Sequence, residues 1–148
     1  RLVFDPAFHD TETLIERVTA GSFDYRVIPE IARAIQTHVK SSGALERYVL
    51  NLWQALVKPG SAGISLPDVD VGNLLKGGAS PRALAALARA ARVSAWLDGR
   101  DYLVPEDVRD LFIEVMAHRI FVDPIHALRG DDIVKRLCRA AFDATPVP

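Results

Sequence analysis

Cysteine is almost absent from the sequence, since Cys138 is the only one. A single thiol cannot form an internal disulfide, which excludes a disulfide-stabilised scaffold and favours a cytoplasmic protein. No apolar run reaches the roughly 18 residues of a membrane-spanning helix, and no basic segment precedes an apolar one as in a signal peptide. Basic residues are not in excess either, with 18 Lys and Arg against 19 Asp and Glu. We therefore expect neither a membrane nor a nucleic acid as a partner.

Motifs for nucleotide or metal chemistry are also missing. Nothing matches the phosphate-binding loop G-x-x-x-x-G-K-[ST], so the chain is not expected to hydrolyse a nucleotide unaided. The histidines lie far apart without H-E-x-x-H spacing, and we predict no metal site from His9, His38, His118 or His126. His38 falls on an apolar helical stripe and is predicted to be partly buried. Cys138 is predicted to be a small core residue rather than a nucleophile.

Helical periodicity, in contrast, is present along most of the sequence. Apolar residues make up 49% and charged residues 25%, as in ordinary globular domains. No convincing strand pair is visible, so we predict an all-α helical bundle of about six helices within one domain. The predicted helices run roughly from Asp10 to Gly21, Pro29 to Val39, Leu45 to Leu56, Pro81 to Ala95, Pro105 to Val115 and Asp131 to Phe142.

Glycine and proline interrupt this periodicity between Lys58 and Ala79. The stretch contains five glycines and two prolines and shows no sustained helical or strand pattern. We predict one long irregular loop over residues 58–79. Loops of this length are uncommon in compact domains and tend to be functional or mobile. We expect this one to be mobile, with function confined to its last residues.

The segment that follows, Gly77–Ala83, has the features of an anion site at a helix start. Ser80 is a good N-cap and Pro81 is well suited to the first helical position. Arg82 then falls in the first turn, where free backbone N–H groups favour an anion. Ser80, Pro81 and Arg82 are therefore candidate phosphate contacts.

Three arginines share one face of this predicted helix. At 100° per residue, Arg89 and Arg92 return close to the direction of Arg82, opposite the apolar stripe, so all three are predicted to face outward. Trp96 lies on the same side and could stack on Arg92 or cover a contact with another domain. Ordinary solvated arginines behind a capped helix would give the same pattern, and sequence position alone does not decide between the two interpretations.

Four motifs in order resemble the lid of MoxR-family AAA+ ATPases. They are G-A-S-P-R-A at 78–83, G-R-D-Y at 99–102, V-P-E-D-V at 104–108 and H-R-I at 118–120. The resemblance is strongest over residues 77–122. Two features depart from the family pattern: the loop at 58–79 is longer than usual, and Val104 stands where a threonine cap is common. Both bear on the subfamily rather than on Arg82.

The resemblance implies a function that the residues alone do not give. Arg82 would be the sensor-2 arginine, reaching the γ-phosphate of ATP that a missing core domain holds with Mg²⁺. Residues 1–22 would be the link and first helix from that core, and residues 23–148 the lid. The family implies a ring, typically hexameric, in which the core domain and neighbouring subunits are partners. It also implies chaperone-like remodelling or cofactor maturation of client proteins, often beside a von Willebrand factor A domain protein.

The ends of the chain agree with this expectation. Arg1 stands where a complete protein would have methionine, which suggests a fragment, and Pro146-Val147-Pro148 looks like the usual end of such proteins. An alternative interpretation is a free-standing helical adaptor or regulatory domain that binds a protein partner through its arginine face. A structural domain without a site is a third.

Overall fold

The computed structural model describes residues 12, 24–67, 69–127 and 132–148. The chain divides into two units, Arg1–Arg33 and Ala34–Pro148, and each is described by itself. Apart from Glu12, the helix predicted between Asp10 and Gly21 lies outside the described residues. The helical elements are η2 (Tyr25–Val27), α3 (Ile28–His38), α4 (Gly43–Val57), η3 (Pro59–Ala62), α5 (Val71–Leu74), α6 (Pro81–Leu97), α7 (Pro105–Met116), η4 (Ala117–Arg119), α8 (Pro124–Ala127) and α9 (Ile133–Ala144); the strands are β1 (Leu75–Gly77) and β2 (Phe121–Val122).

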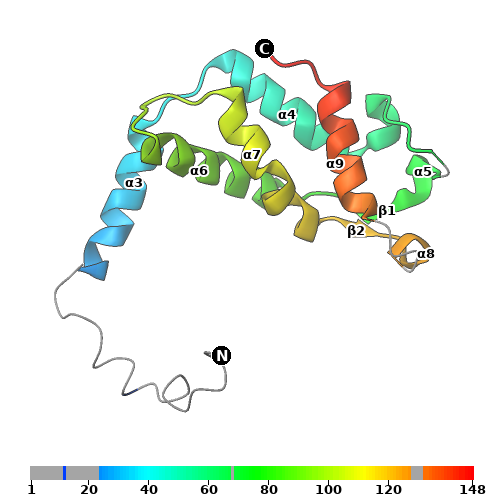
Figure 1. Cartoon of the computed structure of the whole chain (residues 1–148), viewed down its shortest axis with the longest axis horizontal. Helices are drawn as coiled ribbons and strands as arrows, with labels where there is room; N and C mark the ends of the chain where they lie inside the picture. Colours follow the sequence, from blue (N-terminus) through cyan, green and yellow to red (C-terminus); the bar gives the residue numbers. More distant parts are fainter. Residues whose placement is uncertain (1–11, 13–23, 68, 128–131) are drawn as a thin grey trace, which may run out of the picture. The chain divides into compact units, whose positions relative to one another are not determined.

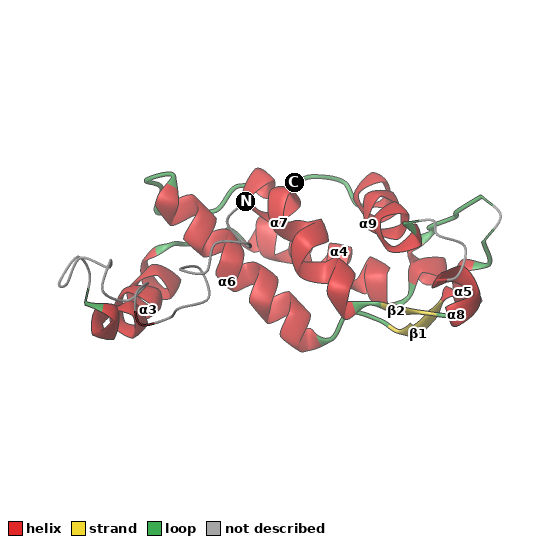
Figure 2. Cartoon of the chain, turned by 60° about the horizontal axis from the view of Figure 1, so that its bottom comes forward, coloured by secondary structure: helices red, strands yellow, loops and turns green. Residues whose placement is uncertain are grey.

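Four helices of the second unit, α4, α6, α7 and α9, surround its core (Figures 1 and 2). The most extensive helix pair is α6 against α7, while α4 packs on both α9 and α6. Each of the four contributes a large side chain with no exposed surface, and burying each one contributes roughly 1.5–3 kcal/mol. These side chains are Leu52, Leu87, Phe112 and Leu137. The predicted all-α class is confirmed.

Helix α6 begins where its sequence predicts. Ser80 has extended backbone angles and is the N-cap, and Pro81 takes the first helical position. The apolar stripe faces the core, because Ala83, Leu87, Ala91 and Ala95 are all fully buried. Past the end of the helix, Gly99 has a φ of 74°, the left-handed conformation that glycine adopts without strain and that commonly terminates helices.

The stretch predicted as one irregular loop, residues 58–79, contains three short elements. Ile64, Leu66 and Leu74 from it are buried in the core, so it is packed rather than loose. Its last element, β1, pairs antiparallel with β2 through Leu75 and Val122. The expectation that no strands pair was therefore wrong, because strands of two or three residues are too short to show an alternating pattern.

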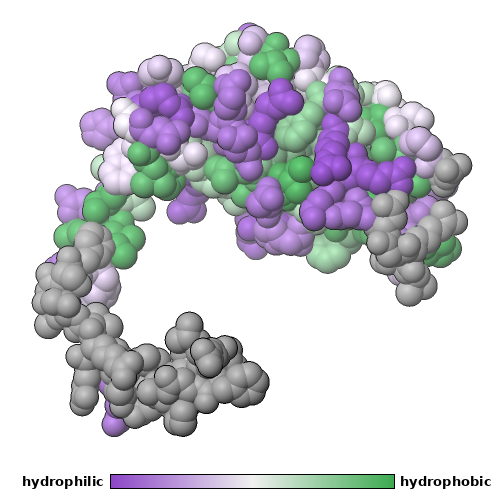
Figure 3. Space-filling model, in the orientation of Figure 1, coloured by the Kyte–Doolittle hydropathy of each residue, from purple (hydrophilic) through white to green (hydrophobic). Residues whose placement is uncertain are grey.

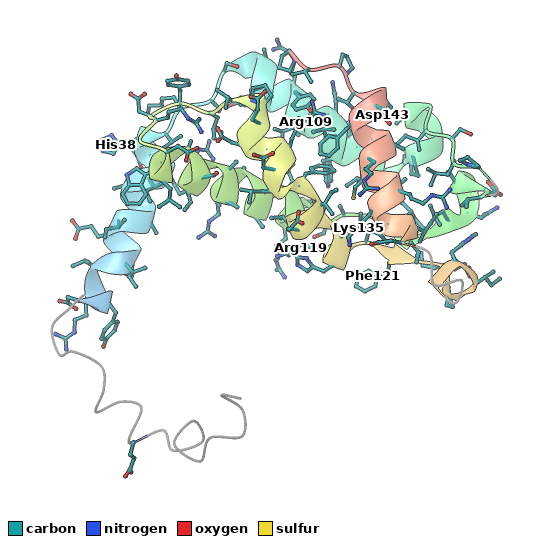
Figure 4. The ribbon with its side chains drawn as sticks, viewed as in Figure 1. His38, Arg109, Arg119, Phe121, Lys135 and Asp143 are labelled. Atoms are coloured by element: carbon teal, nitrogen blue, oxygen red, sulfur yellow. The ribbon has the colours of Figure 1, made fainter. Side chains whose placement is uncertain are left out.

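Two predictions about single residues have opposite outcomes. Cys138 is fully buried, and burial raises the pKa of its thiol to about 12, so it is an unreactive core residue as predicted. His38 was predicted to be partly buried but is exposed at the end of α3 (Figure 4). Helical spacing placed it beside Ile35 and Val39, which are buried, but the last turn of a helix covers only part of each face.

The surface over α7 and α9 is largely hydrophilic (Figure 3). Within it, the guanidinium of Arg109 on α7 lies 5.1 Å from the ring centroid of Phe142 on α9 (Figure 4 labels Arg109). The same ring lies 4.8 Å from that of Phe112 below it. Aromatic and cation–π contacts of this kind help hold the two helices together.

Candidate functional site

The start of α6 is held firmly against the end of α4. We call the segment Gly78–Arg82 the helix mouth. The indole N–H of Trp53 donates a 2.7 Å hydrogen bond to the carbonyl of Ala79, and Ala79 itself is buried. At Gly78, an added Cβ would lie 3.0 Å from Cα of Val57 and 3.1 Å from the carbonyl oxygen of Leu56. A side chain here would require the neighbouring backbone to shift by a few tenths of an ångström, so glycine suits this close approach of two backbones.

The N-cap residue Ser80 accepts hydrogen bonds from most of the backbone amides in the first turn of α6. Ser80 accepts from the amide of Ala83 through its carbonyl at 2.8 Å and through its hydroxyl at 3.4 Å. The Ser80 carbonyl also accepts from the amide of Leu84 at 3.3 Å. Pro81 has no amide hydrogen to offer. Among the described residues, the amide of Arg82 is the first-turn donor left without a partner, which makes it the backbone group that can meet an anion.

Arg82 is exposed, and its side chain has no hydrogen bond or ion pair within the described part of the chain. Its neighbour Ala83 is fully buried, so the backbone beneath the arginine is fixed while the guanidinium projects away from the core. Such a side chain offers several N–H donors and a full positive charge, which suits a phosphate or a carboxylate. The arrangement can bind an anion, but it contains no nucleophile or general base.

The other two arginines of the predicted face differ from each other. Arg89 is exposed as expected. Arg92 is half-buried, and its Nε donates a 3.3 Å hydrogen bond to the carbonyl of Val39, so the expectation that it faces outward was wrong. The sequence of α6 could not reveal this partner, which lies 53 residues away. Trp96 is 46% exposed, and neither cation–π contact found among the described residues involves it.

The G-R-D-Y and V-P-E-D-V motifs meet in one structural ion pair. Arg100 donates to both carboxylate oxygens of Asp107, at 2.8 Å and 2.6 Å, and also to Asp98 at 2.9 Å. Asp107 additionally accepts the amide of Val104 at 2.9 Å, and so supplies the cap that valine cannot. Burial opposes ionisation of Asp107, but these hydrogen bonds outweigh it and lower the pKa of its carboxyl group.

The H-R-I motif closes the end of α7. The imidazole of His118 lies 2.9 Å from the carbonyl of Glu114, and Nε of Arg119 donates to the carbonyl of Val115 at 3.1 Å. Basic side chains commonly satisfy the last carbonyls of a helix in this way. Ile120 then turns into the core. The bonds of His118 and Arg119 therefore help to terminate α7.

The described residues show neither a metal cluster nor a membrane-spanning helix. Within residues 24–67, 69–127 and 132–148, no cluster of His, Cys, Asp and Glu has the geometry of a metal site. The same ranges contain no helix that combines the length and the apolar character needed to cross a membrane.

Comparison with known proteins matches this fold and these motifs. Residues 70–137 match the family described as the AAA lid domain. The whole chain is similar to Protein MoxR from Methylorubrum extorquens, with 55% identity over 99% of this chain, and to Protein MoxR from Paracoccus denitrificans, with 46% identity over 99%. The chain belongs to the MoxR family and forms its lid domain.

The chain spans less than half the length of these MoxR relatives, namely 43% of each. A shorter match, 39% identical over 52% of this chain, is to the protein named Chaperone MoxR1 from Mycobacterium tuberculosis. A solved structure from Cytophaga hutchinsonii, provisionally described as an ATPase, superposes with a TM-score of 0.72 at 25% identity, over 94% of this chain and 44% of its own. The helix mouth and Arg82 lie within the matched lid region.

Proposed function

We propose that this MoxR lid senses the nucleotide of an AAA+ ATPase through Arg82. The observation that carries the proposal is an exposed arginine, without a partner in the described residues, on a backbone that buried neighbours hold still. Its guanidinium and its own amide are donors, and phosphate oxygens are acceptors only, so the two sets fit each other. Ser80 and Pro81 contribute by shaping the turn that carries these donors.

In this proposal, Arg82 is the sensor-2 arginine and meets the γ-phosphate of ATP from the lid side. A charge-assisted hydrogen bond of this type contributes roughly 1.5–3 kcal/mol, and it is useful for catalysis because charge develops on the transferred group. Loss of the γ-phosphate removes the partner of Arg82. The lid is then free to move relative to the nucleotide-binding part of the protein, and this motion transmits the state of the nucleotide.

The rest of the ATPase would supply what this chain lacks. Residues 1–22 would link it to a core domain that holds ATP and Mg²⁺, and residues 23–148 would be the lid. We propose a cytoplasmic hexameric ring in which the lid contacts its own core and neighbouring subunits. The name of the M. tuberculosis relative, Chaperone MoxR1, supports a chaperone role, for which we propose remodelling or cofactor maturation of client proteins. A von Willebrand factor A domain protein is the partner we propose.

Fluorescence energy transfer between lid and core would test the sensing role. Asp143 on α9 is exposed and suits an acceptor label after substitution by cysteine, because the native Cys138 is buried (Figure 4 labels Asp143). With a donor on the core of the full-length ATPase, we expect different transfer efficiencies with a non-hydrolysable ATP analogue and with ADP. Arg82→Ala should abolish that difference, whereas Arg89→Ala should preserve it. An undiminished difference in Arg82→Ala would contradict the proposal.

A further inference from the structure

Trp53 ties the middle of α4 to the helix mouth. Its indole N–H reaches the carbonyl of Ala79 across 26 positions of sequence, at 2.7 Å. The ring itself is half-buried and packs against the hydrophobic core. The carbonyl of Ala79 lies just before the cap residue Ser80, in a buried residue. Without the indole N–H, this part-buried carbonyl would lose the hydrogen bond that ties the turn to α4.

Gly78 adds a second contact to the same helix. Its backbone lies close to Val57 and Leu56, in the last turn of α4. An added Cβ would be 3.0 Å from Cα of Val57 and 3.1 Å from the carbonyl oxygen of Leu56, which is closer than ordinary van der Waals contact. Figure 2 shows the start of α6 beside the end of α4. Two consecutive residues, Gly78 and Ala79, are thus held by one helix immediately before the turn that carries Arg82. The position of the arginine is set by α4 as well as by α6.

We propose that Trp53 is a positioning residue for Arg82, holding the helix mouth where the guanidinium can meet a phosphate on another domain. The inference rests on the sensing function proposed above. A side chain that must reach across to a separate domain depends on where its backbone starts, and a shift of about 1 Å at a reacting group can lower a rate as much as a hundredfold. The Trp53–Ala79 hydrogen bond restrains such a shift.

Trp53→Phe in the full-length ATPase tests this role, since phenylalanine keeps an aromatic ring in place and removes the N–H donor. We expect kcat for ATP to fall about three- to tenfold with KM changed less than about twofold, because the loss concerns the transition state rather than ground-state binding. In an Arg82→Ala background, Trp53→Phe should cause no further fall, since it acts through that arginine. Trp96→Phe, the same exchange at the only other tryptophan of the chain, should leave kcat unchanged.

The outcomes separate this inference from the proposed function. If Arg82→Ala leaves kcat unchanged, the sensing function fails and the inference fails with it. If Arg82→Ala lowers kcat but Trp53→Phe does not, only the positioning role is overturned. Equal losses from Trp53→Phe in both backgrounds would also overturn it, since Trp53 would then act independently of Arg82.

Gly78→Ala provides a second variant in case Trp53→Phe does not fold. The added Cβ pushes the helix mouth away from Val57 and Leu56. Gly78→Ala should lower kcat, and it should cause no further fall in the Arg82→Ala background. Gly60→Ala is its matched control, because a Cβ at Gly60 meets nothing within 4 Å. An unchanged kcat in Gly78→Ala would overturn the claim that the mouth must stay against α4.

Discussion

Replacing Arg82 with alanine is expected to lower ATP turnover of the full-length ATPase at least tenfold while leaving most ATP binding intact. A tenfold loss corresponds to about 1.4 kcal/mol, close to the lower end of the roughly 1.5–3 kcal/mol that one charge-assisted hydrogen bond to the transferred phosphoryl group contributes. Binding is spared because the core holds the rest of the nucleotide in this proposal. The fold is spared because the side chain is exposed and, within the described residues, contacts no polar partner. Steady-state kcat and an independent measurement of ATP affinity would check both parts.

Two substitutions sharpen this prediction. Arg89→Ala removes a second exposed arginine from the same helix and should leave kcat unchanged, since Arg89 lies further from the helix mouth. Arg82→Lys keeps the charge but loses the planar fork of donors, so an intermediate kcat is expected. Unchanged turnover of Arg82→Ala at saturating ATP would rule out the sensor role.

Local sequence signals predicted helices well where they were strong. Ser80, Pro81 and the spacing of the small apolar residues fixed both the start of α6 and the face that it buries, because capping and periodicity are local effects. The same reasoning failed for residues 58–79. There, short elements are stabilised by burying Ile64, Leu66 and Leu74 in a core made by distant helices, and no local pattern reveals such packing.

The candidate site shows the same division. The exposure of Arg82 followed from helix geometry, since it lies opposite the buried stripe. The hydrogen bond that holds the helix mouth could not be predicted in this way. Trp53 and Ala79 are 26 positions apart, and the sequence around a helical tryptophan does not indicate which carbonyl its N–H will bind. For Arg92, helix geometry gave the wrong expectation. Its spacing from Arg82 predicted an outward-facing side chain, but its Nε donates a hydrogen bond to the carbonyl of Val39, directly after α3.

Asp107 carries the second prediction, which concerns stability. Its carboxylate is only 4% exposed and accepts two hydrogen bonds from Arg100 and one from the amide of Val104. The interactions join the loop after α6 to the first turn of α7, and these two helices have the most extensive contact among the described elements. Removing the charge leaves Arg100 with Asp98 and partial access to solvent, which limits the cost.

Asp107→Asn is expected to lower the free energy of unfolding by about 1.5–3 kcal/mol at pH 7, the range for hydrogen bonds to a charged group. Because the folded-state pKa of Asp107 is lowered, its contribution is complete above the unfolded-state value of about 3.9, decreases below that value, and is lost as the pH falls through the lowered folded-state pKa. Urea titrations of the chain should therefore show the difference between the two proteins narrowing as the pH is lowered below about 4. Asp110→Asn, on the exposed side of the same helix, should change stability by less than about 0.5 kcal/mol. A gap between wild type and Asp107→Asn that stays constant from pH 7 to pH 3 would mean that packing, not the charge of Asp107, accounts for the loss.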